Sequence, residues 1–391
     1  MARLHIYDRR ERALVGAADR LLSVAAVVAR RLRARRQPLS PARILLVRLE
    51  RIGDLLMTLP AIADVRALAP EAHIDLVVGS WNRELAERIG VVNRVLVLDA
   101  AWLAREGGGL GLPALLKSAR QWRSEAYDLA INFEPDVRSN LLLAASGAAW
   151  TAGYASGGGG PLLDAAFDYD TTAHTTGNAR RLVRNVFGRT AVAPSFPLLS
   201  VPIRASVRDV RSAPRGPLVG VHVSSGRAIK QWPPARFAEV ARRLVDRTHA
   251  TIVLTGSGAD RPLVDDVKRM LPEGHVIDVA GDVTLPSLSA ILQELDLFIT
   301  GDTGPMHLAT TVGTPIVAVF GPSDPARYAP SGPHDRVVRV DLPCAPCNRI
   351  RLPPARCIGH TPDCLALVTT DAVFEAAVAV MHGSRALLAR P

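Results

Sequence analysis

The sequence has no long low-complexity tract, and its N-terminal segment lacks an apolar run long enough to cross a membrane. The apolar stretch there, Leu21–Ala29, is far shorter than the ~20 residues that a transmembrane helix needs. A secretory signal peptide is also disfavoured, because arginines flank this stretch on both sides, whereas a signal peptide is basic only at its start. The absence of both features predicts a cytoplasmic protein.

Cysteine is scarce, and all four cysteines lie in one segment, at Cys344, Cys347, Cys357 and Cys364. The spacing C-x2-C-x9-C-x6-C is typical of a tetrahedral thiolate metal site, and a cytoplasmic chain has little use for disulfides. The segment is therefore a candidate for a structural zinc or iron ion; reduced thiols in a loop and a redox pair are the alternatives. A catalytic metal is disfavoured, because four protein ligands leave no open coordination position.

Basic residues have little excess over acidic ones outside the N-terminal segment, and the chain after residue 43 is nearly neutral, although the whole chain carries a formal charge of +10. Residues 1–43 contain 11 arginines against only Asp8, Glu11 and Asp19. A nucleic-acid-binding domain carries its Lys and Arg on the folded body, where they neutralise phosphates, so nucleic-acid binding is disfavoured. The segment instead favours contact with anionic lipid headgroups at a membrane surface. A solvated helix packed on the protein's own surface is the alternative.

The length of 391 residues and an apolar content of 48% predict two domains, since single cores stop growing at ~250–300 residues. From residue 43 short apolar runs alternate with amphipathic stretches, as in parallel α/β proteins. We expect a basic amphipathic extension over 1–42, Rossmann-like domains over 43–200 and 215–370, and a C-terminal helix over 371–391. The Gly- and Pro-rich stretch 155–216 loses the alternation and contains the boundary.

The pattern predicts four strands and four helices in each domain. The strands are expected at 44–49, 74–78, 95–98, 129–133, 218–223, 251–255, 295–299 and 316–320, and the helices at 54–68, 84–89, 114–124, 137–145, 234–246, 261–270, 285–293 and 306–311. Pro60 should kink the first helix or end its regular hydrogen bonding, unless that helix starts later. Parallel sheets bind ligands at the carboxyl ends of their strands, which directs attention to the loops after Leu49, Val223, Thr255 and Ile299.

The first of these loops leads into Gly53, which permits a tight turn, and Asp54, which begins a helix. Asp54 has two interpretations. Aspartate is a favoured helix cap, which stabilises by ~1 kcal/mol. The alternative, which the residues alone favour less, is a general base: a carboxylate held at a strand end to accept a proton from an attacking hydroxyl.

The second loop carries the hydroxyls of Ser224 and Ser225 together with Arg227 and Lys230. Hydroxyls and cations suit a diphosphate, and a cation there can offset the charge that builds on a leaving nucleotide. We assign this role to Lys230 ahead of Arg227, for which a solvated surface position is the alternative.

The third loop runs through Asp302, Thr303 and Gly304 into a helix that contains His307. Its backbone N–H groups are expected to face an anion without a metal, because a helix N-terminus carries about half a positive charge. Asp302 would repel a phosphate, so we expect it to hydrogen-bond sugar hydroxyls. A histidine early in a helix is as often structural as functional.

The fourth loop, Gly256-Ser-Gly-Ala-Asp260, repeats the strand–loop–helix theme. Asp260 is placed to take the ribose hydroxyls of a nucleotide, as acidic residues do in related sheets. The third glycine of the dinucleotide fingerprint is absent, which argues against a dehydrogenase.

Taken together, three segments resemble glycosyltransferase family nine, the heptosyltransferases. They are residues 44–54 with Thr58-Leu-Pro60, the segment Lys230-Gln-Trp-Pro233, and Gly301-Asp-Thr-Gly304 with His307, and the resemblance spans about residues 43–385. It implies a GT-B fold, in which two doubly wound domains face a central cleft. It also implies an inverting, metal-independent transfer of heptose from ADP-heptose to the lipopolysaccharide inner core, on the cytoplasmic face of the membrane.

Residue by residue, the resemblance implies that Asp54 is the base and that Lys230 binds the diphosphate. It places Ser224 and Ser225 in the phosphate loop, and Asp302, Thr303, Gly304 and His307 in the donor-binding turn. Asp260 stands where the family commonly has Glu, and the Arg-rich extension is atypical. A nucleotide-sugar epimerase or hydrolase, which would turn over without an acceptor, and a non-catalytic nucleotide-sugar-binding module are the alternatives on this fold.

Overall fold

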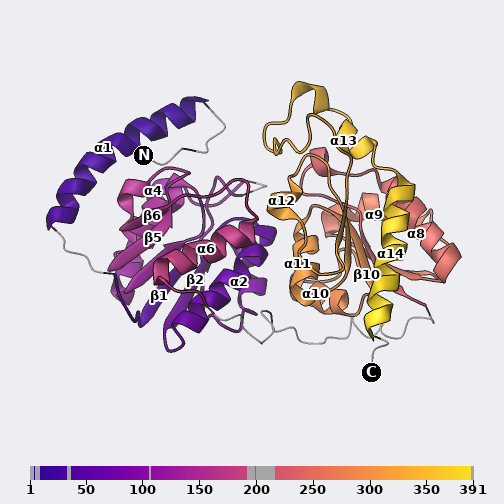
Figure 1. Cartoon of the computed structure of the whole chain (residues 1–391), viewed down its shortest axis with the longest axis horizontal. Helices are drawn as coiled ribbons and strands as arrows, with labels where there is room; N and C mark the ends of the chain where they lie inside the picture. The colour runs from indigo at the N-terminus through magenta and orange to yellow at the C-terminus, as the bar shows by residue number, and fades with distance from the viewer. Residues whose placement is uncertain are drawn as a thin grey trace. The chain divides into compact units, whose positions relative to one another are not determined.

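The computed structural model describes residues 4, 9–32, 37–104, 107–191, 199 and 216–388. The chain divides into two units, Met1–Ser200 and Val201–Pro391, and each is built on its own sheet flanked by helices (Figure 1). The residues 201–214 that we expect between the two domains lie outside the described residues. Among the described helices, none combines the length and the apolar character that a membrane span requires.

Unit 1 contains a six-stranded parallel sheet with the strand order β3-β2-β1-β4-β5-β6. The strands are β1 (Arg43–Val47), β2 (His73–Val78), β3 (Arg94–Val97), β4 (Leu129–Asn132), β5 (Trp150–Tyr154) and β6 (Ala165–Phe167). The helices are α1 (Arg9–Leu32), α2 (Ile52–Leu68), α3 (Arg83–Ala86), α4 (Leu112–Gln121), α5 (Val137–Ala145) and α6 (Thr175–Phe187). This is the doubly wound order, and its topological switch point lies between β1 and β4.

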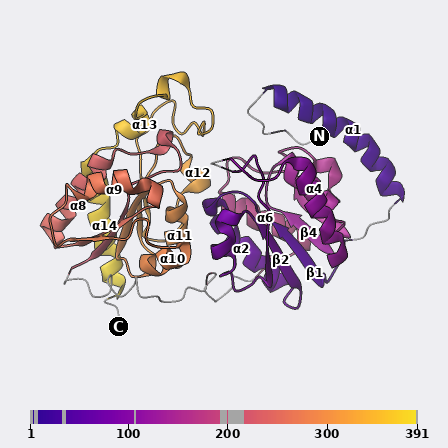
Figure 2. The same cartoon turned by 180° about the vertical axis from the view of Figure 1, so that it is seen from behind.

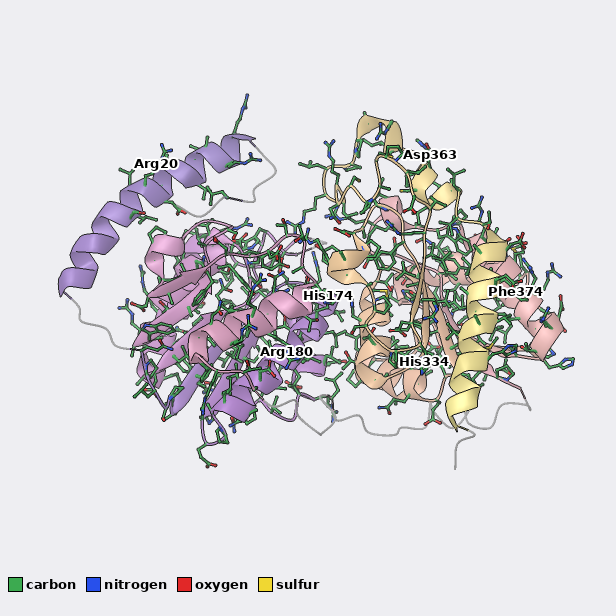
Figure 3. All side chains as sticks on the ribbon, in the orientation of Figure 1. Arg20, His174, Arg180, His334, Asp363 and Phe374 are labelled. Atoms are coloured by element: carbon green, nitrogen blue, oxygen red, sulfur yellow. The ribbon has the colours of Figure 1, made fainter. Side chains whose placement is uncertain are left out.

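Helix α2 continues through Pro60 without a break and begins two residues earlier than predicted, at Ile52. It packs beside α6, and the two helices are joined by an ion pair in which Arg180 Nε lies 2.7 Å from Asp64 Oδ2; Arg180 is labelled in Figure 3. Helix α6 falls in the stretch 155–216 that the sequence pattern marks as irregular, so that expectation is wrong for residues 175–187. Its buried positions Ala179, Leu182, Val183 and Val186 follow the helical period.

Unit 2 repeats the same strand order, β12-β11-β10-β7-β8-β9, with its switch point between β7 and β10. The strands are β7 (Leu218–His222), β8 (Thr251–Thr255), β9 (Val276–Asp278), β10 (Leu297–Gly301), β11 (Ile316–Val319) and β12 (Arg336–Val338). The helices are α8 (Pro234–Thr248), α9 (Arg261–Lys268), α10 (Leu285–Gln293), α11 (Gly304–Val312), α12 (Pro325–Tyr328), α13 (Asp363–Ala366) and α14 (Thr370–Leu388).

The C-terminal helix α14 is part of the core of unit 2. Val373, Ala377 and Val380 are buried in the same cluster as the central strands, and α14 packs against α8 (Figures 1 and 2). The guanidinium of Arg243 on α8 lies 4.1 Å from the ring centroid of Phe374. These contacts cover one face of the sheet and leave the carboxyl ends of its strands to the loops.

All eight predicted strands are present, each within two residues of its predicted bounds. Four further strands, β5, β6, β9 and β12, were not predicted. The predicted loops after β1, β7 and β10 leave the sheets beside a switch point, which is where open α/β sheets bind ligands, and the loop after β8 leaves from the strand next to β7.

Candidate functional site

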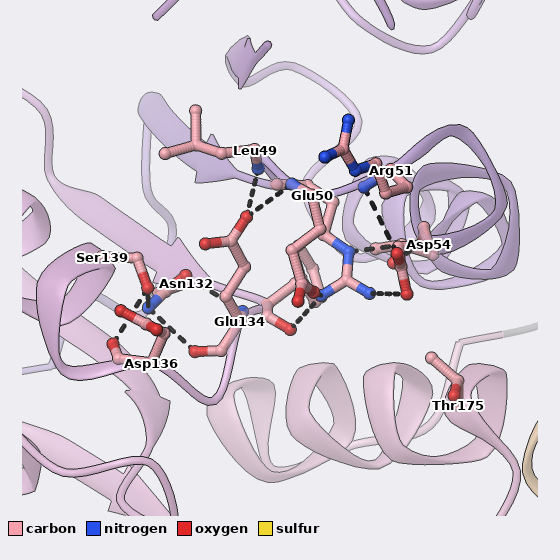
Figure 4. Close-up of polar contacts among 12 residues, drawn as sticks. Leu49, Glu50, Arg51, Asp54, Asn132, Glu134, Asp136, Ser139 and Thr175 are labelled. Carbon is pink, nitrogen blue, oxygen red and sulfur yellow. Dashed lines mark hydrogen bonds and ion pairs between the residues drawn. The ribbon is translucent and has the colours of Figure 1, made fainter. Parts of the chain in front are cut away.

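The site in unit 1 is formed by the loops that follow β1 and β4. Val47 and Asn132 are paired in register at the ends of these neighbouring strands, so the two loops leave the sheet side by side (Figure 4). The first loop carries Arg48 to Asp54, and the second carries Phe133 to Asp136.

Asp54 lies in the first turn of α2, where it both caps the helix and keeps an exposed carboxylate. Its Oδ2 accepts a hydrogen bond from the backbone N–H of Arg51 at 3.2 Å, and its Oδ1 lies 3.4 Å from Arg48 Nη2. The side chain remains 29% exposed. The capping role is therefore present, and the carboxylate is still partly exposed.

Arg48 is the cation that connects the two loops. Its side chain is 3% exposed, and Nη1 donates to the carbonyl of Phe133 at 2.7 Å and pairs with Glu50 Oε2 at 2.9 Å. Burial alone would lower the pKa of this guanidinium, but the surrounding carboxylates Glu50, Asp54 and Glu134 raise it above its ordinary value. Arg48 is therefore a permanent cation.

Glu134 is a buried carboxyl group that the sequence analysis missed. Its Oε1 accepts hydrogen bonds from the backbone N–H groups of Leu49 and of Glu50, the latter at 2.9 Å (Figure 4). Burial, and then the charge of Glu50, raises the pKa of Glu134 to about 8 against the lowering effect of Arg48. The only sign of this residue in the sequence is its position directly after the predicted strand 129–133, and a single glutamate there has no distinguishing pattern.

The site in unit 2 lies at the ends of β7 and β10, where His222 and Thr300 are paired in register. Lys230, from the loop after β7, reaches the loop after β10 and donates through Nζ to Asp302 O at 2.6 Å and to Asp302 Oδ2 at 2.8 Å. Ser323 Oγ donates to the same carboxylate oxygen.

The Asp302 carboxylate therefore binds two side chains of the protein itself, Lys230 and Ser323, where sugar hydroxyls were expected. Burial would raise the pKa of Asp302, but Lys230, His307 and the hydrogen bond from Ser323 outweigh it and hold the pKa below its usual range. A buried carboxylate this well paired organises the turn, and it presents the lysine at the switch point.

The two serines of the predicted phosphate loop point to different partners. Ser224 Oγ lies 3.2 Å from His222 Nε2, and Ser225 Oγ donates to the carbonyl of Arg227 at 2.5 Å. On its other side, His222 Nδ1 lies 3.1 Å from Thr255 Oγ1, and burial lowers the pKa of His222 to about 4. A neutral histidine thus holds Ser224 in place.

Helix α11 offers fewer amides to an anion than its glycine-containing turn suggested. Thr303 is its N-cap, and the Thr303 hydroxyl accepts a hydrogen bond from Met306 N at 3.4 Å. Pro305 has no N–H to give, so Gly304 supplies the first amide of the helix. His307 is 6% exposed and close enough to Asp302 to lower its pKa.

Asp260 is engaged by its own loop. Its Oδ2 accepts hydrogen bonds from Ser257 N at 2.7 Å and Ser257 Oγ at 2.6 Å. Burial would raise the pKa of Asp260, but these bonds and one from Ser224 hold it below its usual range. The carboxyl group therefore stays ionised, and it lies in the short helix η5 (Gly258–Asp260) that follows β8, the strand paired with β7.

The four cysteines are free thiols with increasing burial along the chain, from exposed Cys344 to buried Cys364. Burial, and then the other three thiols, raise the pKa of Cys364 to about 11, so the four lie in one region. Within the described parts of the chain, however, no group of three or more His, Cys, Asp or Glu side chains is arranged to hold a metal ion. The arrangement expected for a structural zinc or iron ion is therefore not formed.

Comparison with known proteins gives a consistent result. The family model for glycosyltransferase family 9 (heptosyltransferase) matches residues 115–354. Lipopolysaccharide heptosyltransferase 1 of Pseudomonas aeruginosa is 26% identical over 321 residues, which cover 78% of this chain and 86% of that protein.

Two solved structures extend the likeness to three dimensions. A family 9 glycosyl transferase from Veillonella parvula aligns with a TM-score of 0.74 and 25% identity, over 88% of this chain and 98% of that one. The ADP-heptose lps heptosyltransferase II of E. coli aligns with a TM-score of 0.69 and 22% identity, over 88% of this chain and 99% of the other. With two parallel six-stranded sheets of the same order, the expected GT-B fold is confirmed.

Proposed function

Since the chain belongs to glycosyltransferase family 9, whose model covers more than half of it, we propose that it transfers heptose from ADP-heptose to a hydroxyl of a lipopolysaccharide core acceptor. The donor and the acceptor are those named for its relatives from E. coli and Pseudomonas aeruginosa. The observation that carries the mechanism is the partly exposed carboxylate of Asp54 at the carboxyl end of β1.

In the proposed reaction Asp54 accepts the proton of the acceptor hydroxyl while the hydroxyl oxygen attacks the anomeric carbon of the heptose. A new carbon–oxygen bond forms on one face of the sugar as the bond to the diphosphate breaks on the other, so the configuration inverts. The N–H of Arg51 and the guanidinium of Arg48 orient the Asp54 carboxylate toward this task.

Unit 2 holds the donor in this proposal. Lys230 offsets the charge that develops on the leaving ADP, with the Ser224 and Ser225 loop and the Thr303–Gly304 turn around the diphosphate. The pairing of Lys230 with Asp302 keeps the ammonium at the switch point before the donor arrives. Asp260 takes the ribose hydroxyls.

No metal ion is needed in this step, because Lys230 provides the positive charge at the leaving group. A structural zinc or iron ion on the four cysteines is a separate proposal, and it requires the thiols to move together. Metal analysis of protein purified without chelator decides it: one equivalent of metal, lost on Cys347→Ser with Cys364→Ser, supports the ion, and metal-free active protein rejects it.

The first test is ADP release from ADP-heptose, in chelator, with and without heptose-deficient lipopolysaccharide. Acceptor-dependent release supports the proposed transfer. Release that does not depend on the acceptor indicates a hydrolase, and no release rejects this donor and acceptor pair.

The role of Asp54 is separated from its capping role by a pair of variants. Asp54→Asn keeps an oxygen that can accept from Arg51 N but cannot accept a proton, whereas Asp54→Ala loses both. We expect Asp54→Asn to lower kcat by roughly 10²–10⁴-fold with unchanged affinity for ADP-heptose. If only Asp54→Ala were impaired, capping would explain the residue and another base would be needed.

We also propose that helix α1 places unit 1 on an anionic membrane surface. Its inward side contacts the glycine loop before η3 (Gly160–Leu162): Asp19 Oδ1 accepts from Gly159 N at 2.8 Å, and a Cβ at Gly158 would lie 2.3 Å from Val15 Cγ1. Its outward side bears Leu14 and Leu21, which are 72% and 76% exposed.

The charge of α1 is divided in the same way. Asp19 faces the protein, whereas Arg10, Arg12 and Arg20 are exposed; Arg20 is labelled in Figure 3. Exposed leucines among arginines are what an anionic lipid surface binds, through apolar insertion and electrostatic attraction. The alternative from the sequence analysis is a helix that packs on the protein's own surface. It explains the contacts on the inward side of α1 but not the exposed leucines on its outward side.

Co-sedimentation with vesicles tests this surface. We expect binding to vesicles that contain phosphatidylglycerol, weak binding to phosphatidylcholine alone, and a loss of roughly tenfold or more for the double variant Leu14→Ala, Leu21→Ala. Leu367→Ala is the matched control, because Leu367 is a 54% exposed leucine of unit 2. Equal binding by the double variant and the control would reject the assignment.

A further inference from the structure

Glu134 is the buried carboxyl group nearest to the loop that carries Asp54, and the proposed mechanism does not use it. It is 1% exposed, and its Oε1 accepts from two consecutive backbone amides, those of Leu49 and Glu50. These amides belong to the loop after β1, whereas Glu134 follows β4. A carboxyl group from one strand end therefore holds the loop of the neighbouring strand.

The backbone of Glu134 is itself held by Asn132, the last residue of β4. Asn132 Oδ1 accepts from Glu134 N at 3.0 Å, and Asn132 Nδ2 donates to Glu134 O at 3.1 Å. The same Nδ2 group lies 3.0 Å from Ser139 Oγ and 2.8 Å from Asn140 Oδ1, both on α5. Glu134 thus stands on a buried polar network that ties the sheet to α5.

Arg48 forms a second connection between the same two loops. Its Nη1 donates to the carbonyl of Phe133, which precedes Glu134. Its Nε donates to Asp54 O at 3.3 Å, and its Nη2 lies 3.4 Å from Asp54 Oδ1. Asp54 is therefore linked to the Phe133–Glu134 segment through one rigid guanidinium.

We propose that Glu134 is a positioning residue for the transfer reaction: with Arg48, it fixes the Leu49–Asp54 loop so that the Asp54 carboxylate stays aligned with the acceptor hydroxyl. The inference rests on the proposed role of Asp54 as the base. Glu134 touches neither substrate nor reacting atoms, and it acts through the backbone of the loop and through the guanidinium that it shares with Asp54.

The charges around Glu134 shift its ionisation, so its effect on the Leu49–Asp54 loop should depend on pH. Arg48 and Glu50 approach it from the loop after β1, and Asp136 from its own loop. Burial, followed by the charge of Glu50, raises the pKa of Glu134 to about 8, so the carboxyl is protonated at neutral pH. Once ionised, Glu134 competes with Asp54 for Arg48, because one guanidinium then faces three carboxylates.

Two substitutions separate the positioning role from a merely structural one. Glu134→Gln keeps an oxygen that accepts from both amides and cannot ionise, and Glu134→Ala removes the acceptor. We expect Glu134→Ala to lower kcat by roughly 10²-fold with little change in the KM for ADP-heptose, because a small displacement of a catalytic group has this effect. Glu134→Gln should keep most of the activity at pH 7 and lose the alkaline decline of kcat near pH 8.

Asp335 provides the matched control. It also accepts from two backbone amides, those of Gly332 and Ile316, and burial raises the pKa of its carboxyl group. It directly precedes β12 and lies beside the first residue of β11, at the opposite end of these strands from the predicted loops. Asp335→Ala should destabilise unit 2 without changing the pH profile of kcat.

The outcomes are distinguishable. Wild-type activity in Glu134→Ala, or an unchanged alkaline limb in Glu134→Gln, would overturn the positioning role. If Glu134→Ala fails to fold, as judged by its binding of ADP and its melting curve, the pH profile of Glu134→Gln decides alone. An inactive wild type, or an active Asp54→Asn, would instead overturn the proposed function, whatever Glu134 does.

Discussion

Each unit has a buried carboxyl group at the switch point of its parallel sheet, and the pKa values of these two groups are shifted in opposite directions. In unit 1 Glu134 follows β4 and its pKa is raised, first by burial and then by Glu50. In unit 2 Asp302 follows β10 and its pKa is lowered, because Lys230, His307 and Ser323 outweigh the effect of burial. The positions in the fold are equivalent, and the protonation states at neutral pH are opposite.

The difference lies in the number of partners for each cation. Arg48 faces Glu50, Asp54 and Glu134, whereas Lys230 donates to Asp302 through both the backbone carbonyl and the carboxylate of that residue. Burial favours the neutral acid in both cases, and a dedicated cation with hydrogen bonds reverses this preference. The protonation state of a buried carboxyl group can therefore be inferred only when the other acids that compete for its cation are also considered.

The largest expected effect comes from neutralising the two carboxyl groups one at a time. Asp302→Asn leaves Lys230 largely buried without its counter-charge and should destabilise unit 2 by about 3–5 kcal/mol. Glu134→Gln replaces a group that is already neutral in the folded state at pH 7, so it should not destabilise unit 1 and should raise its stability there, because the unfolded wild type gains by releasing the proton. Urea unfolding of both variants, followed for each unit separately, measures the contrast.

The control for this contrast is a variant that removes both charges of unit 2. Lys230→Met combined with Asp302→Asn should recover much of the stability lost by Asp302→Asn alone, because no charge is left buried without a partner. Equal losses for Asp302→Asn and Glu134→Gln would mean that the two carboxyl groups share one ionisation state at pH 7.

The next effect is the pH dependence of stability. The folded pKa of Glu134, about 8, lies above the usual value of 4.5, so the folded state holds a proton that the unfolded state releases. Stability should therefore fall as the pH rises from 4.5 to about 8, and Glu134→Gln should lack this fall. For Asp302 the folded pKa is lowered, so its contribution is complete above the usual value of 3.8 and is lost as the pH falls below it.

Melting temperatures measured across this pH range test both predicted pH dependences, that of Glu134 and that of Asp302, in one experiment. Toward alkaline pH, the melting temperature of the wild type should fall relative to that of Glu134→Gln. The melting temperature of the wild type should exceed that of Asp302→Asn, and this difference should become smaller only in acid. A wild type whose advantage over Glu134→Gln grew with pH would show that Glu134 is ionised at neutral pH.

The smallest effect is expected from Ser323→Ala. It removes one of the hydrogen bonds to Asp302 Oδ2 and should cost about 1 kcal/mol in unit 2. The pKa of Asp302 should rise toward its usual value, while the alkaline limb assigned to Glu134 stays unchanged. A shift of that limb would show that the two sites are coupled.

The sequence pattern predicted the central strands well because they are continuous apolar runs, buried on both faces of a parallel sheet. Three of the missed strands, β6, β9 and β12, are only three residues long and partly exposed, so they carry little pattern. Helix α6 has a clear helical period, but it was hidden by the glycines and prolines on either side of it. The prediction for this stretch relied on its glycine and proline content instead of its hydrophobic periodicity, and it was wrong for residues 175–187.

The candidate site shows the same division. Asp54, Lys230 and the Thr303–Gly304 turn were predicted from strand-end loops and from the family resemblance, and the structure places each beside a switch point. Glu134 was missed, since a single glutamate after a strand has no distinguishing pattern. Asp302 was found, but its partner was not, because nothing in the local sequence connects it to Lys230.

By itself, the sequence determined two α/β units, the loops at their strand ends and the membership in a family, since each depends on periodicity or on short motifs. Only the tertiary structure decided which charges share a partner. Glu134 contacts Leu49 across 85 positions of the chain, and Lys230 contacts Asp302 across 72. Ionisation is set by burial and by such distant neighbours, and a linear pattern records neither of them.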